Sequence, residues 1–262
     1  MDRGSYAAAS AGMLHLTKID LVNNNLANLS TPGFKGQYLT SRQTEFGDTL
    51  ASTISARSPY AEGDQERTPG VTGIGTVTDF SVGPIENTAQ PLHAALRKEN
   101  EFFVINGPDG PLYTRAGNFV LNESGKLSTP DGLTVSSGNG EITVNQGIPE
   151  ITSGGLIQIR GLPGGLSQVG GRLQVVKFDD PSILERVGAN RFKVRGADAQ
   201  QGQVVNNPSI VPKSLERANI SAVQAIVELI SASRGFELYA KSAQSIDTMN
   251  QTAIQRLGSR SA

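Results

Sequence analysis

The chain has 262 residues, a formal net charge of −1, two His and no Cys. This length suffices for one large domain or two modest ones with a real core, the balanced charge argues against a general attraction to nucleic acid or anionic lipid, and the lack of Cys excludes disulfides and thiolate chemistry. No apolar run approaches the roughly 20 residues that a membrane helix needs, and we expect no cleaved secretory signal because the first residues lack an apolar core.

The first 35 residues predict an amphipathic helix that ends in a turn. The turn is indicated by Thr31, Pro32 and Gly33, because Pro and Gly interrupt helices. Asn23, Asn24, Asn25 and Asn28 are poor helix formers, and their amides either bond neighbouring backbone or mark a frayed end. We expect His15 to have a surface or packing role. Apolar side chains recur every three or four residues along one face, namely Tyr6, Ala9, Met13, Leu16, Ile19, Val22, Leu26 and Leu29.

Residues 36–81 predict an extended arm with short strand pieces. The segment is rich in Ser, Thr, Gly and Gln, and Pro59, Pro69 and the glycines of residues 70–75 argue against a compact unit. These glycines match neither GxxxxGK nor GxGxxG, so a phosphate-binding loop is excluded. We expect the arm to lie over other subunits and to be mobile in a free monomer, because it has little apolar surface to offset the entropy of ordering.

Residues 82–212 change to a strand-like period. Two hairpins are predicted, one around residues 106–111 and one around residues 122–125. Arg115 and Glu123 could pair across strands, and such a pair contributes about 0–1 kcal/mol if it is exposed. For residues 92–98 a strand and a helical turn both remain open. Turn chemistry about every ten residues favours an antiparallel domain of short strands, with strands at residues 102–105, 112–115, 119–121, 126–127, 133–135, 142–144, 156–160, 173–178 and 192–194.

The last segment, residues 213–262, predicts a long helix that must pack on another helix. Residues 221–224 fit a capping box, and Asn219 is a competing cap. A small and apolar seam has coiled-coil spacing, and it slips once before resuming, as a stammer requires. The seam consists of Ala222, Ile226, Leu229, Ser233, Phe236, Ala240 and Ala243, followed by Ile246, Met249, Ala253 and Leu257. The predicted fold class is therefore α+β, with the terminal helices in a coiled-coil-like α domain and an inserted antiparallel all-β domain.

Enzyme chemistry finds little support. Asp179 and Asp180 precede a Pro, where carboxylates are usually solvated, and neither His15 nor His93 has metal-ligand spacing or a GxSxG partner. Basic residues do not cluster with aromatic residues as in a nucleic-acid surface. We therefore expect no catalytic, cofactor or metal site. A glycan-processing enzyme would have to use Asp179 with Glu185.

Three stretches resemble the rod, hook and hook-associated proteins of the bacterial flagellum. The longest is the N-terminal signature of residues 24–35, NNLANLSTPGFK. Residues 102–104, 113–119 and 125–127 resemble the hairpin motif of the rod and hook proteins, although residues 92–101 lack the two family glycines that precede it. Residues 215–223 resemble the family's entry to the C-terminal helix. Within that helix, residues 234–237 (RGFE) resemble proximal-rod members more than distal-rod members, as does the start of the chain.

The resemblance implies a structural subunit of the basal-body rod that transmits torque from motor to hook. The resemblance also implies export by the flagellar type III apparatus to the periplasmic rod. We expect the terminal helices to be largely disordered in the free subunit and to fold on assembly, because isolated helices of such sequence are only marginally stable. Expected partners are proximal and distal rod proteins and the inner membrane ring, without nucleic acid, small-molecule substrate or cofactor. The expected assembly interface comprises the apolar residues named above for the N-terminal helix, except Ala9 and Leu29, and the seam residues of the C-terminal helix, except Ala253. It also includes Asn24, Asn25, Asn28 and Phe34. A distal rod subunit, or a secreted self-associating filament or adhesin, is the alternative.

Overall fold

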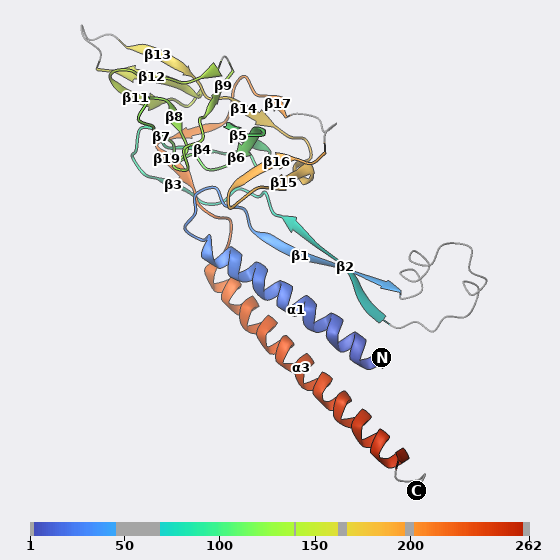
Figure 1. Cartoon of the computed structure of the whole chain (residues 1–262). Helices are drawn as coiled ribbons and strands as arrows, with labels where there is room; N and C mark the ends of the chain where they lie inside the picture. The colour runs from blue at the N-terminus through green and yellow to red at the C-terminus, as the bar shows by residue number, and fades with distance from the viewer. Residues whose placement is uncertain (1–2, 46–68, 139, 162–166, 197–201, 259–262) are drawn as a thin grey trace, which may run out of the picture. The chain divides into compact units, whose positions relative to one another are not determined.

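The computed structural model describes residues 3–45, 69–138, 140–161, 167–196 and 202–258 (Figure 1). The fold is α+β, as predicted, with two helices and many short antiparallel strands in this part of the chain. It divides into a helical unit (residues 1–26, 37–77 and 222–262) and a β unit (residues 27–36 and 78–221).

The helical unit contains α1 (Arg3–Ala27) and α3 (Ala222–Gly258), which run antiparallel (Figure 1). It also holds a two-stranded ribbon of β1 (Gln37–Glu45) and β2 (Pro69–Thr78). These strands are longer than the short pieces that we expected in the arm. Residues 46–68, the middle of the predicted arm, lie outside the described residues.

Both helix boundaries follow local signals. α1 ends at Ala27, and the predicted turn follows, with Gly33 at φ +66°. α3 begins directly after Ser221, as the capping box predicted. The competing cap at Asn219 is wrong, because its side-chain amide bonds the backbone of Gly36 and of residues 79–81 instead. Residues 214–216, which precede the helix, form a strand.

The β unit is built on a six-stranded antiparallel sheet in the order β15-β16-β6-β5-β14-β17. Its central strand β5 is buried along its first five residues. Successive side chains point to opposite faces, so Phe103 and Ile105 enter one hydrophobic core, whereas Phe102 and Val104 enter another. The strands are β5 (Glu101–Gly107), β6 (Gly110–Thr114), β14 (Val175–Lys177), β15 (Leu184–Arg186), β16 (Arg191–Val194) and β17 (Gln203–Val204).

Smaller sheets surround this one. Three strands, β11 (Ile148–Ile151), β12 (Leu156–Arg160) and β13 (Gln168–Arg172), form one sheet. The others are two-stranded: β3 (Ile85–Asn87) with β19 (Ser214–Glu216), β4 (Ala94–Leu96) with β18 (Ile210–Pro212), β7 (Val120–Leu121) with β8 (Leu127–Ser128), and β9 (Ser136–Ser137) with β10 (Gly140–Glu141). A 3₁₀ turn, η1 (Pro181–Ile183), precedes β15.

The strand predictions hold best where a hairpin was recognised. Both predicted hairpins are present, and the open segment, residues 92–98, contains strand β4. The strands expected at residues 133–135 and 142–144 are reduced to isolated bridges, through Thr134, Val135 and Thr143. Very short strands such as β3 and β17 were missed, because two or three residues cannot establish a period.

Candidate assembly surface

The helices α1 and α3 pack through a histidine that lies over a glycine. A Cβ atom built on Gly235 would lie 2.4 Å from Cε1 of His15, so only a glycine leaves room for the ring. The His15 ring also lies 5.2 Å from the ring of Tyr239, tilted by 33°. His15 therefore has the packing role that the sequence predicted.

The side of α3 that faces α1 carries small residues. Ala225 and Ala232 are buried, and Leu229 and Phe236 are half-buried. Small side chains allow two helix backbones to approach closely, which fits the close contact at Gly235. The sequence did not single out Ala225 or Ala232.

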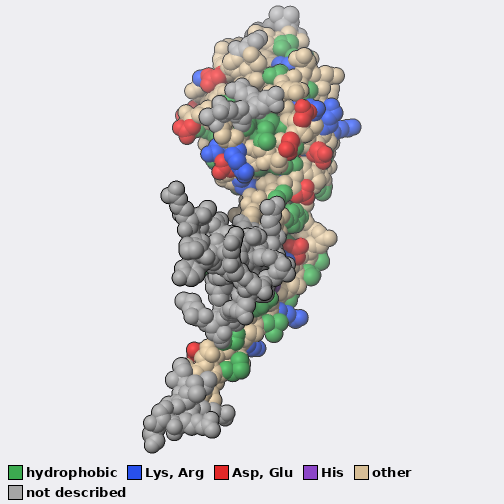
Figure 2. All heavy atoms as spheres, turned by 90° about the vertical axis from the view of Figure 1, so that its right-hand side faces the viewer, with side chains coloured by type: hydrophobic (Ala, Val, Ile, Leu, Met, Phe, Trp, Pro, Cys, Tyr) green, Lys and Arg blue, Asp and Glu red, His purple; other side chains and the backbone are tan. Residues whose placement is uncertain are grey.

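A second apolar surface lies on the opposite side of α3. We call Val223, Ile226, Val227 and Ile230 the outer patch of α3; their exposed fractions run from 46% to 72%. Because successive helical residues turn by about 100°, these four side chains point away from Ala225 and Ala232. The first turns of α3 are therefore apolar on both sides, and Figure 2 shows hydrophobic side chains at the surface along the helical part of the chain.

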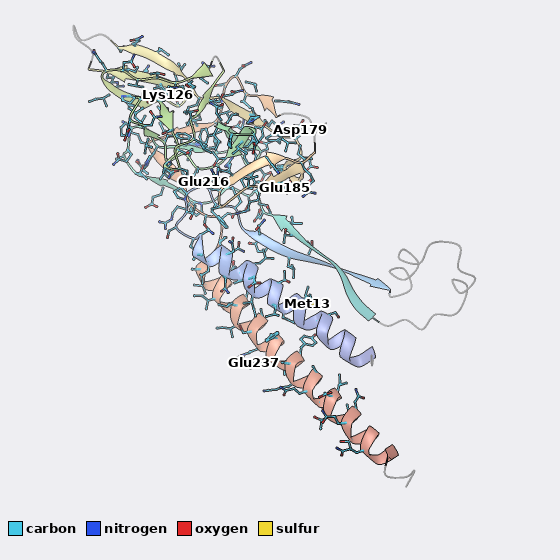
Figure 3. The ribbon with its side chains drawn as sticks, in the orientation of Figure 1. Met13, Lys126, Asp179, Glu185, Glu216 and Glu237 are labelled. Atoms are coloured by element: carbon cyan, nitrogen blue, oxygen red, sulfur yellow. The ribbon has the colours of Figure 1, made fainter. Side chains whose placement is uncertain are left out.

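The helix α1 has one buried face and a mixed outer face. Val22 is buried, whereas Met13 and Leu16 have exposed fractions of 64% and 45% and form the outer patch of α1. Further along the same outer side, Asp20 and Asn23 are exposed and polar. Met13 is labelled on α1 in Figure 3.

The predicted interface residues thus fall on several surfaces. The side chains of Tyr6 and Leu257 lie outside the described residues. Val22, Asn25 and Phe34 are buried; Ile19, Leu26, Asn28, Leu229, Ser233, Phe236 and Ile246 are half-buried; Met13, Leu16, Asn24, Ala222, Ile226, Ala240, Ala243 and Met249 are exposed. Along α3 the predicted seam thus includes both half-buried and exposed side chains, and its role in assembly stays a prediction.

Asn25 explains part of the Asn-rich signature. Its side chain donates from Nδ2 to the carbonyl of Gln37 at 2.8 Å, and its Oδ1 accepts from the Gln37 amide at 3.1 Å. This pair of bonds joins α1 to the first residue of β1. The contact role expected for these amides is present here within the chain.

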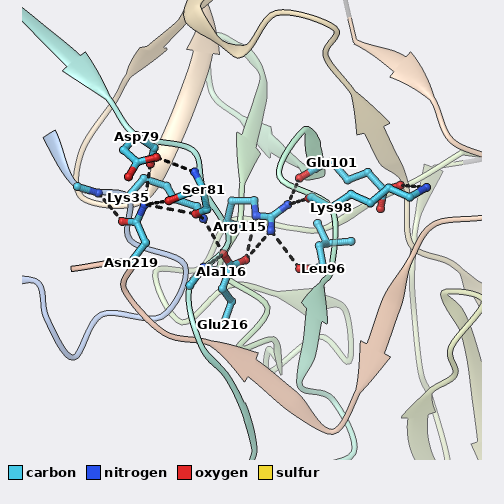
Figure 4. A network of polar contacts seen from close by, with 12 residues as sticks. Lys35, Asp79, Ser81, Leu96, Lys98, Glu101, Arg115, Ala116, Glu216 and Asn219 are labelled. Atoms are coloured by element: carbon cyan, nitrogen blue, oxygen red, sulfur yellow. Dashed lines mark hydrogen bonds and ion pairs between the residues drawn. The ribbon is translucent and has the colours of Figure 1, made fainter. Parts of the chain in front are cut away.

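The end of the signature enters a buried ion cluster in the β unit (Figure 4). The cluster consists of Lys35, Arg115 and Glu216, whose side chains are all fully buried. Glu216 accepts from Lys35 Nζ at 2.6 Å and from Arg115 Nε at 2.9 Å, and it forms an ion pair with Arg115 Nη2 at 2.8 Å. Its Oε1 also accepts from the Gly83 amide at 3.0 Å.

The expected pair of Arg115 with Glu123 is wrong. Glu123 lies exposed in the turn after β7, whereas Arg115 points into the β unit. Besides Glu216, the Arg115 guanidinium donates to the carbonyls of Leu96, Lys98 and Glu101. Burial lowers the pKa of Arg115 and that of Lys35, although the nearby Glu216 carboxylate opposes both shifts.

Phe34 also belongs to the interior of the β unit. It is fully buried, and the guanidinium carbon of Arg186 lies 4.6 Å from the centre of its ring. Burial lowers the pKa of Arg186 to about 10. Gly33, the residue before Phe34, has a positive φ, and a Cβ atom on it would lie 2.3 Å from the amide nitrogen of Ala116. The second half of the signature therefore anchors this segment rather than presenting its side chains outward.

The carboxylates considered for catalysis do not form a pair. Asp179 and Glu185 are labelled in Figure 3. The carboxylate of Asp179 lies 2.6 Å from Nζ of Lys177 and that of Glu185 lies 3.8 Å from Nζ of Lys193, so each has its own lysine. Asp180 accepts from the Ser182 amide and caps η1. In the described part of the chain, no group of three or more His, Asp or Glu side chains could hold a metal ion. Of the helices described, none is long and apolar enough to span a membrane.

Comparison with known proteins matches three parts of the chain to flagellar family models. They are the flagella basal body rod protein model (residues 6–35), the flagellar hook protein FlgE/F/G D1 domain (residues 98–159) and the flagellar basal body rod FlgEFG protein C-terminal model (residues 211–256). All three stretches of resemblance in the sequence overlap these matches.

Curated relatives align over nearly the whole length. The basal-body rod protein FlgG of Bacillus subtilis is 30% identical over 268 residues, with 97% of this chain and 98% of the relative covered. The basal-body rod protein FlgF is 32% identical in Salmonella typhimurium and 30% identical in Caulobacter vibrioides, in each case with 98% of this chain and 99% of the relative covered. The chain therefore belongs to the family of flagellar basal-body rod proteins that includes FlgF and FlgG.

Proposed function

We propose that this chain is a subunit of the proximal rod, the FlgF type, and that it assembles through the outer patches of α1 and α3. Membership of the family makes it a structural component of the flagellar basal-body rod and not an enzyme. The proximal assignment is supported by residues 234–237, which read Arg-Gly-Phe-Glu. Identity does not separate the two types, since FlgF and FlgG relatives align equally well.

The outer patch of α3 carries the assembly argument. Fully burying a Val or Ile side chain stabilises by about 1.5–3 kcal/mol. Because the four residues of the patch are already partly covered, a neighbour would supply on the order of 5 kcal/mol per copy before the entropic cost of association. In a rod that contact would transmit torque from one subunit to the next.

The proposal extends to the setting of the chain. α1 and α3 form a coiled-coil-like pair whose outer faces meet other proximal and distal rod subunits, and the inner membrane ring is a further neighbour. The place of assembly is the periplasmic rod, reached through the flagellar type III apparatus. The half-buried His15 between the helices supports the pairing.

Two valines of similar exposure test the assembly surface. Val227 in α3 has an exposed fraction of 57% and Val204 in β17 one of 60%. We expect V227D to abolish incorporation into basal bodies and motility, because a carboxylate cannot be buried in an apolar contact without a large cost, and V204D to leave both intact. Normal motility in V227D would contradict the assembly role. Substitution of Leu229 is less informative, since Leu229 lies toward α1.

The proximal position has its own test. An epitope inserted at Asp109, in the exposed turn between β5 and β6, can be labelled with gold in purified basal bodies. We expect the label next to the inner ring. A label confined to the hook-proximal end would assign the chain to the distal rod and leave the assembly surface unaffected.

A further inference from the structure

The outer patches of α1 and α3 lie at different heights along the helix pair. Because His15 of α1 lies over Gly235 of α3, these two residues mark the same height along the axis of the antiparallel helix pair. Met13 and Leu16 flank His15, so the outer patch of α1 lies at that level. The outer patch of α3, Val223 to Ile230, lies five to twelve residues before Gly235. The midpoints differ by about nine residues, or about 13 Å at 1.5 Å per residue.

At the height of each outer patch, the outer side of the other helix carries mainly polar residues. Level with the outer patch of α3, the outer side of α1 carries Asp20, Asn23 and Asn24, all exposed. Level with Met13 and Leu16, the outer side of α3 carries the exposed residues Arg234 and Glu237, with the exposed Leu238 beside them. Two copies placed side by side at one height would therefore set apolar side chains against charges and amides, which is unfavourable.

A shift along the axis removes this mismatch. We infer that the outer patch of α1 in one copy packs on the outer patch of α3 in the next copy, with an axial offset of about nine residues, or about 13 Å. The partner that covers each patch is a second copy of this chain, because every copy carries both the outer patch of α1 and the outer patch of α3. This inference rests on the proposed assembly role and specifies which faces meet.

The contact is heterologous, since different surfaces of the two copies meet. A heterologous contact that includes an axial offset does not close into a flat ring but continues as a helical array. A contact of α3 with α3 would instead be two-fold symmetric and would end at a dimer, and it would leave Met13 and Leu16 uncovered. The patches therefore favour continued assembly over dimer formation.

Disulfide trapping tests the pairing, because the natural chain has no Cys. The staggered pair is L16C with V227C, and the matched level pair is L16C with R234C. A disulfide needs Cα atoms about 4.4–6.8 Å apart, so the two pairs report different offsets. Each variant replaces the natural chain in cells, and isolated basal bodies are treated with a mild oxidant and separated on a non-reducing gel.

We expect only the staggered pair to shift the chain to twice its mass and to higher multiples. Cross-linking by either L16C or V227C alone would show a symmetric contact, and cross-linking by the level pair would show no offset. Either result would overturn the inference, as would an incorporated staggered pair that stays uncross-linked. M13C with I230C gives a second reading of the same offset if the first pair blocks incorporation, because in an antiparallel contact Met13 lies three residues before Leu16 and Ile230 three residues after Val227. If the natural chain itself is missing from basal bodies, the proposed function fails instead.

Discussion

Replacing Glu216 with Gln tests the ion cluster of the β unit. The carboxylate compensates two buried cations, with three contacts of 2.6–2.9 Å to Lys35 and Arg115. The amide of Gln has nearly the same volume, so packing is kept while the negative charge is lost. Breaking a buried ion pair by removing one partner costs about 3–5 kcal/mol, because an uncompensated charge stays buried.

Urea unfolding followed by circular dichroism or by fluorescence of the five Tyr residues measures this loss. With a slope of about 2 kcal/mol per M of urea, we expect E216Q to lower the midpoint by ~2 M. E86Q is the matched control, because Glu86 forms an exposed ion pair with Arg217 at 2.9 Å, and exposed pairs contribute at most about 1 kcal/mol. Equal midpoints for E216Q and the natural chain would refute the reasoning.

The pH dependence gives a second reading of the same variant. Burial already lowers the pKa of Lys35 from 10.5, and Glu216 opposes that shift. Without Glu216, the pKa of Lys35 in the folded state falls further below its pKa in the unfolded state. At a pH between these two pKa values the unfolded state binds more protons than the folded state. The free energy of unfolding therefore rises with pH in that range. We expect the stability loss of E216Q to be largest near neutral pH and to shrink toward pH 10.5. A loss that is constant over this range would show that Lys35 does not carry the uncompensated charge.

Two further predictions concern the helices. G235A should loosen the packing of α1 on α3 in the assembled subunit, because its Cβ would lie 2.4 Å from the His15 ring; proteolysis of the terminal segments in isolated basal bodies should become faster, and H15A should restore resistance in the double variant. Backbone-amide exchange on the free subunit should be fast in α1 and α3 and slow in β5 and β6, since the helices complete their apolar contacts only on assembly; strong protection of the helices would contradict folding on assembly.

The terminal helices were predictable, but the orientation of α3 was not. Spacing at threes and fours selects a face only where the other faces are polar. In the first turns of α3, Ile226 and Leu229 have coiled-coil spacing, yet Ile226 lies with Val223 and Val227 in the outer patch, whereas Leu229 lies toward the side of Ala225. The close contact at Gly235 needs small neighbours, and Ala225 and Ala232 supply them. A search for small residues at helical spacing would have indicated this side.

The ion cluster lay beyond sequence reasoning for a different reason. Lys35 and Glu216 are 181 residues apart in the chain, and Arg115 lies 101 residues from Glu216. A charged side chain is usually exposed unless an oppositely charged partner is buried with it. No local sequence pattern identifies such a partner when it lies more than 100 residues away. The available signal was that Lys35 and Glu216 both fall inside stretches that resemble the rod family. For Arg115, the hairpin pattern indicated a cross-strand partner, Glu123, only eight residues away, and gave no sign of Glu216.

The position of the cluster suggests why the chain keeps three buried charges. Well-packed apolar residues often stabilise a fold as much as a buried ion pair does, so stability alone does not account for it. Lys35 belongs to the segment that follows α1, and Glu216 belongs to the segment that precedes α3. Within the β unit these two segments are also joined backbone to backbone, from the Gly33 amide to the Glu216 carbonyl at 2.8 Å. An apolar contact tolerates sliding, whereas one carboxylate that must satisfy both Lys35 and Arg115 permits a single register. The cluster therefore fixes the register of these two segments within the β unit, which an apolar contact of the same size would not do.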